Sequence, residues 1–179
     1  MVHAHLENPP LAKPRGVFPA GSRHLMKGSG EILMVEDSAT DAELAIRAFR
    51  RAKIANPLKV AATGGAGFDY LFGTGACAGE GPTLPGLILL DLDLPDMTGL
   101  EFLRRLKRDE RTRAIPVVVL SMSGSVPGIL EATRLGAAHY IVKPIDFENF
   151  IRIATMLKLH VTVGAARDVP AVNGGASSL

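Results

Sequence analysis

The sequence predicts an α/β protein built on a doubly wound parallel sheet of five strands. Strand-like and helix-like segments alternate five times along the chain. That order requires right-handed crossovers, which place helices on both faces of a parallel sheet. The run Leu87–Leu90 is apolar without interruption, as expected of a parallel strand that is covered on both faces.

The composition excludes several other classes of protein. The chain has 179 residues, a formal net charge of +2 and 47% hydrophobic residues, with a mean hydropathy of +0.21. These values exclude a fully disordered chain. The single cysteine, Cys77, excludes an internal disulfide, and no apolar run approaches the roughly 18 residues of a membrane-spanning helix. We expect a cytoplasmic protein with a free thiol and no membrane partner.

Glycine and proline mark the expected domain boundaries. Residues 1–29 are rich in both, show no helical or strand period, and lack the apolar core of a signal peptide. We expect a flexible leader there and a disordered tail at 161–179, where the chain is small, polar and glycine-rich. One folded domain is expected over residues 30–160.

This domain is expected to open with a buried strand at 32–35 and a helix from Ser38 to about Ala52. Ser38 is a favourable N-cap, and Asp41 and Glu43 suit the positive end of the helix dipole. Apolar residues at helical spacing predict the face toward the core. They are Ala42, Leu44, Ala45, Ala48 and Phe49.

A second strand is expected at 58–62, followed by a glycine-rich segment at 64–86. We expect an extended loop there, with one short helical patch near 68–72. The segment contains neither a GxGxxG nor a Walker pattern, so we reject a phosphate-binding loop. The third strand is the run 87–90.

The second half repeats the alternation. Helices are expected at 100–108, at 129–135 before the terminating glycine Gly136, and at 146–160; strands are expected at 116–120 and 139–142. The core stripe of the last helix is predicted to be Phe147, Phe150, Ile151, Ala154 and Leu157. Ile153 and Met156 lie off that stripe. They indicate either a wide core face with scattered surface apolar residues or a dimer face, and both interpretations stay open.

Polar residues follow four of the five predicted strands. Ligands of such sheets bind at the carboxyl ends of the strands. The residues there are Glu36, Asp37, Asp91, Ser121 and Lys143. Taken singly, each is more often a cap, a turn residue or a solvated charge. Together they form a strong signal, because the topology brings them to one edge of the sheet.

The residue types at this edge indicate phosphoryl chemistry. Three converging carboxylates repel one another unless a cation joins them, and Mg²⁺ prefers such oxygen ligands. Asp91 stands on the central strand and is the candidate nucleophile, since a carboxylate can form an acyl phosphate. Lys143 would supply a positive charge to the phosphoryl oxygens, and Ser121 a hydroxyl donor.

Four segments resemble the receiver domain of two-component response regulators. They are VEDS at 35–38, LILLDLDLPDMTGLE at 87–101, VVVLSMS at 117–123 and YIVKP at 140–144. The resemblance implies the flavodoxin-like receiver fold with strand order 2-1-3-4-5. Further phrases, such as ANPLKV at 55–60 and KPIDFENF at 143–150, resemble stand-alone regulators encoded alongside bacterial phytochrome-type histidine kinases.

The resemblance also implies roles for individual residues. Asp91 would accept a phosphoryl group from the histidine of a sensor kinase. Asp37 would ligate Mg²⁺ directly together with Asp91, and the backbone carbonyl of Asp93 would be the third protein ligand. Glu36 would support the site, often through water.

The resemblance implies three further roles on the last two strands. Ser121 would bind a phosphoryl oxygen and move on activation, and Tyr140 would turn inward as it moves. Lys143 would pair with the phosphoryl group, and the Lys143–Pro144 peptide is expected to be cis.

Two features depart from the family pattern. Met122 follows Ser121, where the family generally has a small residue, and its bulk would narrow access to the phosphoryl group. Gly124, Pro127 and Gly128 weaken the start of the next helix, so we expect that helix to begin late.

The leading hypothesis is a single-domain regulator that is not an enzyme, apart from self-catalysed phosphotransfer and dephosphorylation. It would signal by protein contact to a downstream partner, through a surface of the fourth helix, fifth strand and fifth helix that could also form a homodimer. Nucleic-acid binding is unsupported, because no basic patch interleaves with aromatic residues. The alternative is a receiver-like interaction module that is not phosphorylated. A haloacid dehalogenase-type phosphohydrolase matches only at Asp91-Leu92-Asp93 and is rejected.

Overall fold

A five-stranded parallel sheet forms the centre of the protein, with the strand order β2-β1-β3-β4-β5. The computed structural model describes residues 29–122, 126–145 and 147–157. The strands are β1 (Ser29–Val35), β2 (Leu58–Ala61), β3 (Pro85–Asp91), β4 (Val117–Ser121) and β5 (His139–Val142). The helices are α1 (Ala39–Arg51), α2 (Gly64–Phe72), the short 3₁₀ helix η1 (Gly75–Cys77), α3 (Gly99–Arg108), α4 (Val126–Arg134) and α5 (Phe147–Met156).

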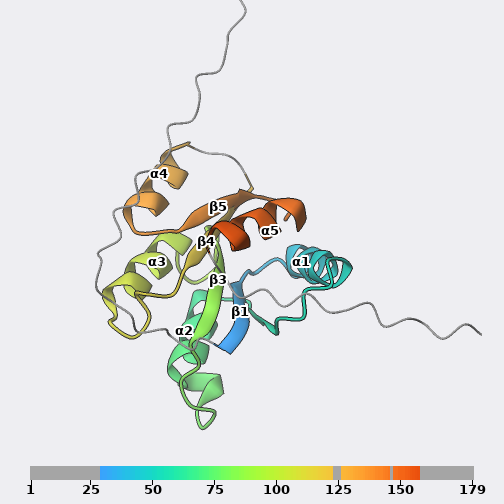
Figure 1. The fold of residues 1–179 in the computed structure, drawn as a ribbon. Helices are drawn as coiled ribbons and strands as arrows, with labels where there is room; N and C mark the ends of the chain where they lie inside the picture. The colour runs from blue at the N-terminus through green and yellow to red at the C-terminus, as the bar shows by residue number, and fades with distance from the viewer. Residues whose placement is uncertain (1–28, 123–125, 146, 158–179) are drawn as a thin grey trace, which may run out of the picture.

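The helices cover both faces of the sheet, as Figure 1 shows. One face packs α1 and α5 against it, with Phe49 and Phe150 in contact at a ring separation of 4.5 Å. The other face packs α2, α3 and α4, with Phe102 at its centre. Every residue of β4 is buried. The predicted fold class and strand order are therefore confirmed.

The glycine-rich segment forms more structure than the sequence predicts. A nine-residue helix, α2, begins at Gly64 after the N-cap Thr63, where a loop is expected. Packing is close at the first residue of this helix, because a Cβ atom on Gly64 would lie 2.6 Å from the sulfur of Met97 and that side chain would have to shift. Glycine lowers helix propensity but allows this close approach, so packing decides the outcome.

Two predicted helix faces need correction. Leu44 is exposed, although its spacing places it in the core stripe of α1. Ile153 is 2% exposed and belongs to the core, whereas Met156 is exposed. The core face of α5 is therefore wider than the predicted stripe, and Ile153 cannot contribute to a dimer face.

The start of α4 is also earlier than predicted. The helix begins at Val126, so Pro127 lies in its first turn, where proline needs no backbone donor. It ends before Gly136, which has a positive φ of 95°, as predicted for a terminating glycine.

Several predictions fall outside the described residues. These are the leader apart from Ser29, the tail at 161–179, Gly124, Asp146, residues 158–160 and the side chain of Phe147. Among the helices that the structure describes, none has the length and apolar character needed to cross a membrane.

Candidate functional site

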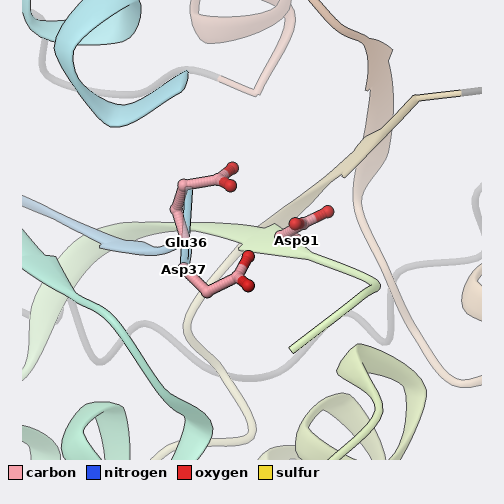
Figure 2. Close-up of side chains that lie close together, drawn as sticks. All are labelled: Glu36, Asp37 and Asp91. Carbon is pink, nitrogen blue, oxygen red and sulfur yellow. The ribbon is translucent and has the colours of Figure 1, made fainter. Parts of the chain in front are cut away.

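Three carboxylates meet at the carboxyl edge of the sheet. Glu36 and Asp37 follow β1, and Asp91 is the last residue of the neighbouring strand β3. Because Val35 pairs in register with Leu90, the next residues on the two strands come side by side. One carboxylate oxygen from each of the three lies within 4.8 Å of the others. Figure 2 shows Glu36 and Asp37 diverging from the end of β1, with Asp91 beside them.

Lys143 reaches this cluster from the end of β5. Its Nζ lies 2.7 Å from Oε2 of Glu36 and 3.0 Å from Oδ2 of Asp91. The Lys143 side chain is only 6% exposed, and the two acidic side chains are equally buried. The backbone N–H of Lys143 donates to the carbonyl oxygen of Ser121 at 2.9 Å, and the Lys143–Pro144 peptide is cis.

A third acid, Asp41, also holds Lys143. Its Oδ2 lies 3.0 Å from the lysine Nζ. The sequence marked Asp41 only as a favourable acid in the first turn of α1, and it was missed as a site residue. No local pattern could have revealed it, because Lys143 lies 102 residues away in the chain.

The buried charges perturb one another. Burial, together with repulsion from Asp91, raises the pKa of Glu36 above its ordinary value, although Lys143 acts in the opposite direction. Burial alone would lower the pKa of Lys143, but its contacts with Glu36, Asp41 and Asp91 outweigh burial and raise that pKa. A single ammonium group therefore compensates several converging carboxylates.

The chain around Asp91 is fixed by backbone contacts. The N–H of Leu92 donates to Oδ1 of Asp91 at 2.8 Å. The N–H of Gly99 donates to the carbonyl oxygen of Leu92 at 2.8 Å, which brings the start of α3 against the end of β3. Asp93 forms a single bridge with Thr98, which closes the loop between β3 and α3.

A second residue missed by the sequence, Asp96, lies in the same loop. Its two carboxylate oxygens accept hydrogen bonds from the N–H groups of Gly64 and Gly65, at 2.9 and 2.7 Å. Burial raises the pKa of Asp96, but hydrogen bonds from backbone N–H groups, those of Gly64 and Gly65 foremost, together outweigh it and hold the pKa below its ordinary value. Asp96 thus caps α2 from the loop that follows the candidate nucleophile.

The predicted switch residues lie on the two strands that precede Lys143 in the chain. Ser121 is the buried last residue of β4 and pairs in register with Val142. Tyr140 lies on β5 and is 41% exposed. Ser121 therefore lies at the carboxyl edge of the sheet and Tyr140 two residues before the end of β5, while their roles in switching stay predictions. Met122 is 67% exposed, so most of this side chain lies in solvent.

The donor set suits a hard divalent cation. Three carboxylates lie close enough to share one ion. Burial and repulsion from Asp91 raise the pKa of Glu36, and a bound cation would reduce this repulsion. Mg²⁺ takes such oxygen ligands, commonly with one or two carboxylates and several waters. The residues present therefore fit the expected metal.

Comparison with known proteins identifies the domain. Residues 32–155 match the family model of the response regulator receiver domain. The probable methanogenesis regulatory protein FilR2 of Methanothrix harundinacea (strain 6Ac) is 40% identical over 127 residues, which are 71% of this chain and 80% of that protein. Other curated relatives are matched over smaller shares of their length, from 12% to 39%.

Two solved structures show the same fold. The bacteriophytochrome response regulator AtBRR has a TM-score of 0.66 and 34% sequence identity, over 77% of this chain and 97% of its own. The Mn²⁺-bound form of response regulator Rcp1 has a TM-score of 0.61 and 31% identity, over 75% of this chain and 98% of its own.

Proposed function

The chain belongs to the response regulator receiver family, and on that premise we propose that Asp91 accepts a phosphoryl group from a phosphohistidine of a sensor kinase. Receiver domains act in two-component signalling and are generally phosphoacceptors without enzymatic activity of their own. The observation that carries the proposal is the buried carboxylate of Asp91, with the ammonium of Lys143 at 3.0 Å and two further acids beside it.

The proposed reaction is a phosphoryl transfer between two side chains. A carboxylate oxygen of Asp91 forms a bond to phosphorus, and the bond from phosphorus to the imidazole nitrogen breaks with its electron pair left on the imidazole. Lys143 stabilises the phosphoryl oxygens by charge, and Ser121 binds one of them by its hydroxyl group. The same residues would support self-catalysed transfer and later hydrolysis.

Glu36, Asp37, Asp91 and the backbone carbonyl of Asp93 are proposed to hold Mg²⁺. When bound, this ion supplies positive charge that offsets the charge of the transferred group. The Mn²⁺-bound form of Rcp1 supports a divalent-metal site in a similar domain.

We propose that residues 30–160 work as a stand-alone receiver with a phytochrome-type kinase as its partner. The likeness to the bacteriophytochrome response regulator AtBRR over 97% of that chain supports this assignment. The added phosphoryl charge beside Lys143 and Ser121 would favour a second conformation, in which Tyr140 turns inward. The downstream partner would read this change by protein contact.

The surface of α4, β5 and α5 is the proposed output surface toward the downstream partner, and a homodimer through the same surface is proposed as well. Four large apolar side chains are exposed on these elements, namely Leu130, Tyr140, Val142 and Met156. Sedimentation with and without a phosphoryl mimic tests the homodimer. A monomer under both conditions at high protein concentration would reject it.

Intact-mass measurement tests the phosphoacceptor. The protein is incubated with acetyl phosphate and Mg²⁺, and we expect a gain of one phosphoryl group that disappears in Asp91→Asn. Glu110→Gln, an exposed acid in the turn after α3, is the matched control and should be modified like the wild type. A wild-type chain that gains no mass would favour the alternative, a receiver-like interaction module that is not phosphorylated.

A further inference from the structure

Asp41 differs from the other two carboxylates that hold Lys143. Glu36 and Asp91 are buried at the sheet edge and belong to the carboxylate group that fits a metal ion. Asp41 comes instead from the first turn of α1, and its side chain is 29% exposed. It contacts the ammonium group as closely as Asp91 does, at 3.0 Å.

The backbone holds Asp41 in place for this contact. Its N–H donates to the hydroxyl oxygen of the N-cap Ser38 at 3.2 Å, which fixes the first turn of α1. Ala45 and Phe49 bury the same helix against the sheet. The carboxylate of Asp41 is therefore presented to Lys143 by a rigid element, which favours a preorganised contact.

The ammonium group has three hydrogens and three carboxylate neighbours, at 2.7, 3.0 and 3.0 Å. A bound cation would share the oxygens of Glu36 and Asp91, and phosphorylation would convert Asp91 to an acyl phosphate. Asp41 is then the one of these three acids that stays free to hold Lys143 in both states.

Space beside Lys143 gives such an anchor a role. A cavity of about 10 Å³, room for roughly one water molecule, lies next to the ammonium group. Asp41 and Glu36 contribute to its lining, together with apolar side chains such as Leu120 and Ile145. Without Asp41, the long lysine side chain could turn into this space and away from Asp91.

We propose that Asp41 is a positioning residue, which holds the ammonium group of Lys143 at the phosphoryl position of Asp91. This inference rests on the proposed phosphoacceptor function. An acid in the first helical turn also interacts favourably with the helix dipole. An interaction with the helix dipole does not require contact with Lys143, which follows β5, whereas the positioning role does require it.

The test measures the affinity of the full chain for beryllofluoride, a phosphoryl mimic, at saturating Mg²⁺. We expect Asp41→Asn to weaken binding by about three- to tenfold, since it loses a charge-assisted hydrogen bond that is partly exposed. Asp41→Glu should recover most of the loss. Glu43→Gln removes the same charge from α1 at an exposed residue that pairs with Arg47, and should stay within about twofold of wild type.

A spectroscopic measurement separates positioning from a structural role. The ammonium ¹H–¹⁵N NMR signal of Lys143 should be observed in the wild-type protein at saturating Mg²⁺ and in Glu43→Gln under the same conditions. It should be weakened in Asp41→Asn, because Asp41 is then the carboxylate not shared with the ion, and exchange with water is slow only when the ammonium group is held. If Asp41→Asn binds beryllofluoride as Glu43→Gln does, or more tightly, the positioning role is wrong while the phosphoacceptor proposal stands. If wild-type protein does not bind beryllofluoride, both are wrong.

Discussion

A Cβ atom on Gly99 would lie 2.1 Å from the backbone carbonyl oxygen of Asp91. No side chain fits at this distance, so the first residue of α3 has to be glycine if α3 is to begin against the end of β3. This close approach closes the loop that follows the candidate nucleophile, and it makes Gly99 part of the architecture of the site.

Gly99→Ala should therefore destabilise the protein by about 2 to 3 kcal/mol, because backbone atoms must move to admit the methyl group. Urea unfolding followed by circular dichroism measures the change. Gly67→Ala is the matched control, since its Cβ would meet side-chain atoms of Phe102 and Val35, at the longer distances of 3.1 and 3.2 Å, and no backbone atom. Equal losses in the two variants would contradict the importance of the backbone contact.

Asp96→Ala should lower the free energy of unfolding by about 1 kcal/mol, because α2 loses an N-terminal cap. The low pKa of Asp96 fixes the sign of the pH dependence. Its contribution is fully present above the unfolded pKa of about 4, and is lost as the pH falls through the lower pKa of the folded state. Unfolding of both proteins at neutral and acidic pH checks this, with Glu110→Ala as control. A constant difference down to acid pH would argue against the cap.

Lys143→Met should lower stability by about 3 kcal/mol without metal, because it leaves Glu36 and Asp91 buried without their counter-charge. Mg²⁺ should restore part of the loss, since a cation bound to the folded state stabilises it. Urea titrations with and without Mg²⁺ provide the measurement. Lys53→Met, at an exposed residue, serves as control. If the unfolding midpoint of Lys143→Met were unchanged, this lysine would not be the principal counter-charge.

Lys107 is expected to make the free energy of unfolding depend on pH in the alkaline range. Its Nζ donates to the carbonyl oxygens of Ile115 and Arg113 at 2.7 and 3.1 Å, and burial lowers its pKa to about 8. Between that value and the unfolded value of about 10.4, the unfolded chain binds more protons. The group's contribution to folding therefore becomes more favourable as the pH rises through this range.

The stability difference between wild type and Lys107→Met measures this contribution. We expect the free energy of unfolding of wild type, minus that of Lys107→Met, to increase by roughly 1 to 2 kcal/mol between about pH 8 and about pH 10. This magnitude allows for the partial exposure of Lys107. Lys53→Met should show no such trend. A difference that stays constant over the same range would mean that Lys107 stays protonated in the folded state.

The sheet and its edge could be predicted because the relevant information is local. Uninterrupted apolar runs identify parallel strands, and the topology then gathers the residues that end them, such as Asp91 and Lys143. The grouping of the acidic residues at this edge could therefore be predicted without knowing the distances between their side chains.

The remaining features depend on contacts between distant segments. Asp41 meets Lys143, and Asp96 meets Gly64, only after the chain has folded. The sequence left Ile153 undecided between a wide core face and a dimer face, because a single helical stripe underestimates a helix that packs broadly against the sheet. Local propensity also could not show that close packing against Met97 would favour glycine in α2.

The glycines at the start of α2 affect the local unfolding of its first turn. Three of its first four residues are glycine, and each costs about 1 kcal/mol relative to alanine in a helix interior. The hydrogen bonds from Gly64 and Gly65 to Asp96 tie this first turn to the β3–α3 loop, so we expect the two segments to open together. Hydrogen exchange at the amides of α2 would then report events at the edge of the sheet, without any label at the site itself.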